Sequence, residues 1–168
     1  MTSAPLSRLV HIPRHLLHVG LDDLARLGVP RDAHDALRAL LADLPLVPDA
    51  ASSAQLMGPP EIALPCLAVL ARHVGQGLRD RNLAIAHDRK RLAVERAKLV
   101  FLSADALVAA VARGDTRAAH EAVLFVTDAA VPIPSVLKAR DAAGLATFVT
   151  AASPIADLAH WRRVDLCA

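Results

Sequence analysis

Three short apolar segments restrict the fold of this chain more than any other feature of its sequence. They cover residues 99–102, 122–127 and 146–150, and a helical pattern follows each of them. The first reads Leu-Val-Phe-Leu, a continuous apolar run that is typical of a strand buried on both faces. Strands that alternate with helices indicate a parallel sheet covered on both sides. We therefore predict a three-layer α/β domain with a parallel sheet of four or five strands.

The other elements are expected from helical spacing and from turn residues. A fourth, short strand is predicted at residues 55–57. Gly75 and Gly77 are expected to interrupt a helical pattern and so to separate two helices. The predicted helices are residues 14–27, 31–43, 65–74, 79–96, 116–121, 135–143 and 155–161. We expect two parts, a small helical N-terminal segment at 1–50 and the α/β domain at 51–168.

A further helix is predicted directly after the apolar run at 99–102. Ser103 precedes it as an N-cap, because a serine oxygen can accept a hydrogen bond from a free amide of the first turn. Leu107, Val108 and Val111 are expected to form its apolar stripe. Gly114 follows, where the helical pattern stops.

Composition excludes several classes of protein. The chain has 168 residues, of which 54% are hydrophobic and 21% charged, so it is not disordered as a whole. Two cysteines are too few for a disulfide framework, and no apolar run is long enough to span a bilayer. The N-terminus lacks a secretory pattern. We expect a soluble protein of a reducing cytoplasm. Three Phe, one Trp and no Tyr argue against base stacking on single-stranded nucleic acid.

Positive charge is concentrated in one part of the chain. Residues 72–98 contain eight Lys and Arg against three Asp and Glu, a local charge of +5 in a chain whose net charge is +2. A basic helix can attract phosphates or an acidic partner. The interpretation that we favour is a solvated helix face with internal ion pairs.

The order of these motifs resembles the P-loop ATPases of the AAA+ type. The resemblance is to the helicase-loader and transposition-helper branch (DnaC-like, IstB-like) and to its initiator relatives, and it covers roughly residues 54–161. The strand and loop opening is matched by Gln55–Pro60, and the helix after the phosphate loop by Cys66–Ala71. The second strand and its helix correspond to Lys98–Val111. The Walker B strand corresponds to Val123–Asp128 and the sensor strand to Gly144–Pro154.

The residues that bind phosphate in this family are missing here. Aligned on Gly58, the expected glycines fall on Glu61 and Ala63, the lysine position holds Leu64, and the Ser/Thr position holds Pro65. A carboxylate repels a triphosphate, leucine removes the neutralising cation, and proline removes a backbone donor. Proline is still a good first-turn residue, so the fold can persist without the ligand.

A second alignment of the phosphate loop stays open. It places the remnant loop at 74–80, with Gly75 and Gly77 as its glycines. Leu78 or Arg79 then stands for the lysine, and Arg79 or Asp80 for the Ser/Thr. An arginine can hold a phosphate as a planar fork of donors.

The catalytic positions that the resemblance implies also depart from the family. Asp128 remains at the end of the Walker B strand, but the base that should follow it is Ala129, so no side chain activates water. The polar sensor position is Ala152. The helical lid of the family is expected to be absent after residue 161. For Asp128, a strand-end carboxylate that caps a loop and a Mg²⁺ ligand both remain possible.

Other residue sets carry little chemistry. His11, His15 and His18 have helical spacing, but Pro13 separates the first two, and no Cys or acid completes a metal site. Cys66 lies in an apolar helix, which favours buried packing over a nucleophile.

We expect no cofactor, no metal and no enzymatic activity. The predicted function is an adaptor or structural subunit that acts through protein contacts, with a protein partner or a second copy and no membrane. The candidate partner-binding residues are Arg79, Arg81, Arg89, Lys90, Arg91, Trp161, Arg162 and Arg163. Trp161 packing on the sheet edge is the alternative for that residue. Two other functions stay open: nucleotide binding with Arg79 and Asp128 as substitute ligands, and association with DNA or RNA through the basic helix.

Overall fold

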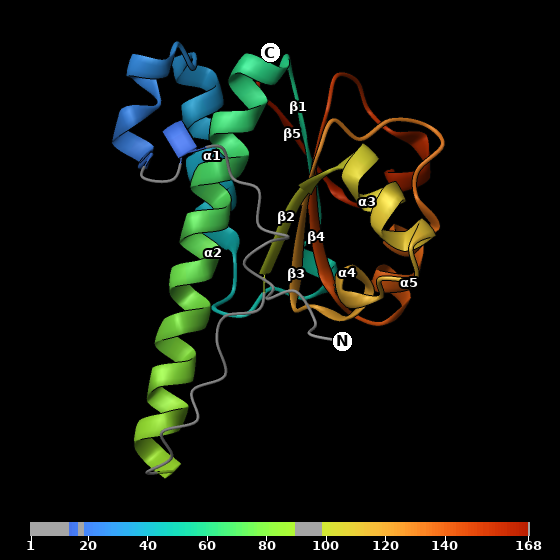
Figure 1. Cartoon of the computed structure of the whole chain (residues 1–168). Helices are drawn as coiled ribbons and strands as arrows, with labels where there is room; N and C mark the ends of the chain where they lie inside the picture. The colour runs from blue at the N-terminus through green and yellow to red at the C-terminus, as the bar shows by residue number, and fades with distance from the viewer. Residues whose placement is uncertain (1–13, 17–18, 90–98, 168) are drawn as a thin grey trace.

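The computed structural model of the chain describes residues 14–16, 19–89 and 99–167 (Figure 1). At its centre lies a sheet of five parallel strands in the order β2-β3-β4-β1-β5. The strands are β1 (Ala54–Met57), β2 (Leu99–Ser103), β3 (Val123–Thr127), β4 (Ala146–Ala151) and β5 (Arg162–Asp165). The four strands predicted from the sequence are confirmed, and β5 is the fifth.

Helices cover both faces of this sheet. α1 (Arg31–Asp43) and α2 (Pro60–Arg89) pack on one face, and α3 (Ala104–Ala112), α4 (Arg117–His120) and α5 (Ser135–Ala142) lie on the other. The predicted three-layer α/β architecture is therefore confirmed, and it is consistent with a P-loop-like domain. α2 runs back along the strands from their carboxyl ends, and its C-terminal part extends beyond the sheet (Figure 1).

Two hydrophobic cores follow from the alternation of side chains along each strand. In β3, Val123 and Phe125 face the α2 core, whereas Leu124 and Val126 face the α3 and α5 core. All four are fully buried, so β3 has no polar face and reads as an unbroken apolar run.

The three phenylalanines of the chain line up across neighbouring strands in the α2 core. Phe101 of β2 is in register with Phe125 of β3, which is in register with Phe148 of β4. Their ring centroids lie 6.0 Å and 5.5 Å apart, within the range of favourable aromatic pairs.

α2 corrects the prediction of two helices, because it continues through Gly75 and Gly77 without a break. Gly77 has a packing role instead. A Cβ there would lie 3.2 Å from the carbonyl oxygen of Leu46 and 3.3 Å from its Cδ1. The segment after α1 thus approaches the helix so closely that only a glycine fits without movement. Glycine inside a helix costs about 1 kcal/mol relative to alanine.

The N-terminal segment is less helical than predicted. In place of one helix at 14–27, the described residues of this range form short 3₁₀ turns, at Arg14–Leu16, Leu21–Asp23 and Ala25–Leu27. α1 has the predicted bounds, and its Leu37 and Leu40 are buried in the same core as the inner face of α2. The segment therefore shares a core with the sheet.

α3 differs from its predicted packing. Ser103 caps it as expected, since its Oγ accepts a hydrogen bond of 3.1 Å from the amide of Ala106. Leu107 and Ala110 are the buried residues of this helix. Val108 and Val111, which we placed in the apolar stripe, are exposed. Only Leu107 of the predicted stripe faces the core.

A buried arginine ties the second face together. Arg140 of α5 is fully buried and donates three hydrogen bonds of 2.7 Å to backbone carbonyl oxygens, those of Ala118, Glu121 and Ala146. Its Nε donates a fourth, of 3.0 Å, to the hydroxyl of Thr147. Burial lowers the Arg140 pKa to about 10, while the Glu121 carboxylate opposes this shift. The guanidinium is therefore still charged at neutral pH and joins α4, α5 and β4.

Candidate functional site

The carboxyl ends of β1 and β4 are where a sheet of this kind binds ligands. After β1 the chain enters α2 on one face, and after β4 it passes to the other face, where Gln55 binds the turn at 156–158. The side-chain Nε2 of Gln55 donates a hydrogen bond of 3.1 Å to the carbonyl oxygen of Leu158, and its Oε1 accepts one of 3.0 Å from the amide of Ile155. Ligands of open α/β sheets bind where two neighbouring connections diverge in this way.

The protein's own backbone closes this position. The amide of Gly58, the first residue after β1, donates a hydrogen bond of 3.0 Å to the carbonyl of Ala151 at the end of β4. On its other side Gly58 faces the residues that follow β5. A Cβ on Gly58 would lie 3.4 Å from the Cβ of Leu166 and 3.5 Å from the Sγ of Cys167. Gly58 is thus enclosed by the ends of both neighbouring strands.

The start of α2 leaves no loop for a phosphate. Only Gly58 and Pro59 separate β1 from the helix, which begins at Pro60. The first alignment needs a loop that extends to Pro65. The structure instead places Leu64, half-buried, and Pro65, buried, inside α2. The loop interpretation of residues 58–65 is therefore wrong beyond Pro59.

Few backbone donors remain at this helix N-terminus. A helix normally leaves four amides without an internal partner. Here Pro59 and Pro60 have no N–H, and the amide of Ile62 donates a hydrogen bond of 3.0 Å to the carbonyl oxygen of Pro59. That leaves the amide of Glu61, whose exposed side chain carries a negative charge. The usual preference of a helix N-terminus for anions is removed by these residues.

The second alignment is also incompatible with a loop. Residues 74–80 lie within α2, where Gly75 and Gly77 are helical. Arg79 is 19 residues from Pro60, which is about 28 Å along the helix axis. Asp128 follows the carboxyl end of β3, the end from which α2 runs away (Figure 1). The two residues predicted as substitute ligands therefore do not converge on one phosphate group.

Asp128 itself lies in an unusual backbone conformation. Its φ is +58°, in the left-handed region that aspartate tolerates better than most residues. Its amide donates a hydrogen bond of 3.1 Å to the hydroxyl of Thr150, and Ala129 N donates 2.8 Å to Thr150 O. The Asp128 side chain is exposed, Ala129 is buried and Ala152 is exposed. Of these three predicted catalytic positions, only Asp128 has an ionisable group.

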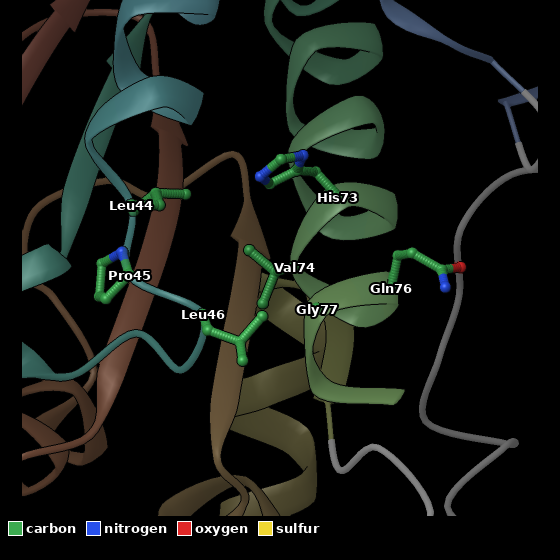
Figure 2. A pocket seen from close by; sticks show the side chains of 7 residues that line it. All are labelled: Leu44, Pro45, Leu46, His73, Val74, Gln76 and Gly77. Atoms are coloured by element: carbon green, nitrogen blue, oxygen red, sulfur yellow. The ribbon is translucent and has the colours of Figure 1, made fainter. Parts of the chain in front are cut away.

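A pocket of about 320 Å³ lies on the α2 side, between this helix and the segment after α1 (Figure 2). Figure 2 shows the side chains of Leu46 and Val74 close together, while Gln76 extends away from them. Its lining residues are Leu44, Pro45, Leu46, His73, Val74, Gln76 and Gly77. Since this lining holds no Lys or Arg, it offers no fixed positive charge for a phosphate.

The C-terminal cluster of predicted partner residues is largely used inside the fold. Trp161 is 4% exposed, lies in the core with α3 and α5, and donates a hydrogen bond of 3.3 Å from its Nε1 to Asp141. The packed alternative for Trp161 therefore holds, and the prediction of an exposed anchor is wrong. Arg162 in β5 donates 2.6 Å to the carboxylate of Asp43 in α1. Only Arg163, its exposed neighbour in β5, has no such contact within the described residues.

The basic cluster is described only in part. Arg79, Arg81 and Arg89 belong to the C-terminal part of α2, and the structure describes their backbone. Lys90 and Arg91 lie outside the described residues, as do His11 and His18.

The described residues offer neither a metal centre nor a helix suited to a membrane. No set of three or more His, Cys, Asp or Glu side chains there is arranged to hold a metal ion. No helix in the described ranges combines the length and apolar character needed to cross a membrane.

Sequence reasoning missed two features that bear on function. The closure of the strand ends by Gly58 depends on β5, which the sequence did not reveal. The exposed face of α3 was hidden because its valines fit an apolar stripe. The signal that could have found it is composition, since Asp105 is the one charged residue in nine. Comparison with known proteins adds no relative: no protein-family model, curated protein or solved structure matches this chain.

Proposed function

We propose that this chain is a catalytically inactive AAA+-like protein that acts as an adaptor or structural subunit through protein contacts. The observation that best supports the proposal is the two-residue connection between β1 and α2. A phosphate loop needs several residues whose amides close around the anion. Gly58 and Pro59 supply one amide between them, and that amide already bonds to Ala151.

Electrostatics at this position also oppose a nucleotide. Glu61 lies in the first turn of α2, beside the point where a phosphate would approach. A carboxylate 4 Å from one phosphate charge costs about 4 kcal/mol at an effective dielectric constant of 20. Leu64 offers no cation in return. These terms act in the same direction, so weak binding by one substitute residue does not restore the site.

Hydrolysis is opposed separately. Water activation needs a base next to the reacting phosphate. Ala129 and Ala152 occupy the positions where the resemblance implies a base and a polar sensor. A protein with this fold and without this chemistry acts through its surfaces. Two such surfaces stand out, the part of α2 that extends beyond the sheet and the exposed face of α3.

Calorimetry with ATP and Mg²⁺ tests the proposal. We expect no binding heat at millimolar ATP for the wild-type chain. The informative variant is Asp128→Ala, and the matched control is Asp157→Ala, which removes another exposed carboxylate. Micromolar binding that is lost in Asp128→Ala and kept in Asp157→Ala would refute the proposal in favour of a nucleotide-binding protein.

The adaptor role is tested by affinity purification from the cells that make the protein, followed by cross-linking and mass spectrometry. We expect a protein partner whose cross-links map to one surface and whose recovery does not depend on ATP. A shift of DNA or RNA that weakens steeply with salt, with no protein partner, would instead favour the nucleic-acid alternative.

A further inference from the structure

α3 is an apolar helix that is covered on one side only. Asp105 is its one charged residue. Val108 is 54% exposed and Val111 is 44% exposed, although both are large apolar side chains. A helix that is apolar all round is typical of a buried helix. Such a face on a protein surface marks an interaction site more often than scattered apolar residues do.

The exposed stripe of α3 has a symmetric arrangement of charge. Asp105, Ala109 and Arg113 are spaced four residues apart, so they follow one another along one face of the helix. All three are exposed. Asp105 lies in the first turn and Arg113 is the C-cap residue. The small Ala109 is midway between them, flanked by Val108.

We propose that α3 packs against the α3 of a second copy of this chain, in an antiparallel pair whose two-fold axis passes near Ala109. Because Asp105 and Arg113 are each four residues from Ala109, this axis places Asp105 of one copy opposite Arg113 of the other, twice. Val108 lies beside this axis and is covered by the second copy, whereas Val111 is two positions from Ala109 and lies on another side of the helix. Alanine at the axis allows the two helix backbones to come close.

The charges select this partner and this orientation. Within one copy Asp105 and Arg113 are eight residues apart, about 12 Å along the helix, so they do not pair with each other. Asp115 lies near Arg113, but both of its oxygens accept hydrogen bonds from Arg117. A parallel pair would place Asp105 against Asp105, whereas the antiparallel pair joins opposite charges and opposes the helix dipoles.

This inference deepens the proposed function, on which it rests, by naming one partner of a protein that acts through contacts. The interface is small, since α3 has nine residues. Stable dimers bury about 1,200–2,000 Å² in total, and smaller interfaces belong to weak complexes. We therefore expect a concentration-dependent dimer with a dissociation constant of roughly 10–500 µM.

Sedimentation velocity of the full chain from about 5 µM to about 1 mM tests this range. We expect the mass to rise from monomer to dimer. Val108→Asp removes an apolar contact and places a charge at the axis, so we expect association at least tenfold weaker. Leu46→Asp is the matched control, because Leu46 is 57% exposed and lies against α2 on the other face. It should dimerise like the wild type.

A charge exchange tests the orientation. Arg113→Asp places two carboxylates opposite each other at both ends, and we expect about tenfold weaker association. The double variant Asp105→Arg with Arg113→Asp restores opposite charges at both ends, so it should recover most of the lost association. Thermal melting of each variant checks the fold, because the exchanged charges oppose the α3 dipole.

Two results would overturn the inference: a monomer at every concentration, or a dimer that neither Val108→Asp nor Arg113→Asp weakens. The ATP titration above is independent of both, so failure of the dimer and failure of the proposed function are separable.

Discussion

Replacement of Arg140 by methionine is the most demanding test of how the second face of the sheet is held together. Methionine has a similar length and no charge, so the change removes the hydrogen-bond donors and keeps much of the packing. Four bonds are lost, three to backbone carbonyls and one to Thr147. The carbonyls of Ala118, Glu121 and Ala146 are left without this donor.

The magnitude follows from two opposing terms. A hydrogen bond from a charged donor contributes about 1.5–3 kcal/mol, so four contribute about 6 kcal/mol at the lower end of that range and about 9 kcal/mol at its centre. Burial of the charge opposes this. Burial lowers the Arg140 pKa from its usual value to about 10, which corresponds to roughly 3 kcal/mol. The difference is about 3–6 kcal/mol, so we expect Arg140→Met to lower the free energy of unfolding by about this amount and the melting temperature by about 10–20 °C.

Urea unfolding followed by tryptophan fluorescence measures this change directly. Trp161 is the one tryptophan of the chain and is buried in the same core as α5, so its emission reports this face. Arg38→Met is the matched control, because Arg38 of α1 is exposed and should change stability by under about 0.5 kcal/mol. If the free energy of unfolding of Arg140→Met lies within about 1 kcal/mol of the wild-type value, Arg140 does not hold α4, α5 and β4 together.

Three further measurements test local features. Ser103→Ala should lower the unfolding free energy by about 1 kcal/mol, and Ser103→Asp should keep it, because only the latter retains an N-cap acceptor. Hydrogen bonds from Arg117 lower the Asp115 pKa from 3.8 to about 2. The Asp115–Arg117 pair therefore stabilises the fold above pH 4, and this stabilisation is lost as pH falls towards 2. In acid unfolding, Asp115→Asn should make the free energy of unfolding less dependent on pH between 4 and 2. Burial raises the Cys66 pKa to about 12. A thiol reagent should therefore modify only Cys167 in the folded protein and both cysteines in denaturant. Two fast-reacting thiols in the native state would contradict the burial of Cys66.

The sequence predicts the strands well where they are buried on both faces, because an apolar run needs no knowledge of the rest of the chain. β3 is the clearest example. It also predicts α1, which Pro30 and Pro45 delimit. β5 escaped prediction for a physical reason. As an edge strand it exposes three of its four residues, two of them arginines, and its pairing with β1 joins segments more than a hundred residues apart.

The candidate site shows the limit of local propensity. Gly75 and Gly77 suggested a break because glycine favours turns, but α2 continues and Gly77 serves a contact with Leu46, thirty-one residues earlier in the chain. The same applies to Arg140. Nothing in the sequence around it indicates that three carbonyls, two of them from residues about twenty positions away, surround its guanidinium.

The length of α2 gives it a mechanical property that the strands lack. Its 30 residues span about 45 Å, whereas the five residues of β3 span about 17 Å. The far end of the helix therefore behaves as a lever arm. A tilt of about 10° around its first turn displaces Arg89 by about 8 Å, several times the displacement at the strand ends. A spectroscopic label near Arg89 would thus report small tilts of α2 as large displacements when a second molecule docks.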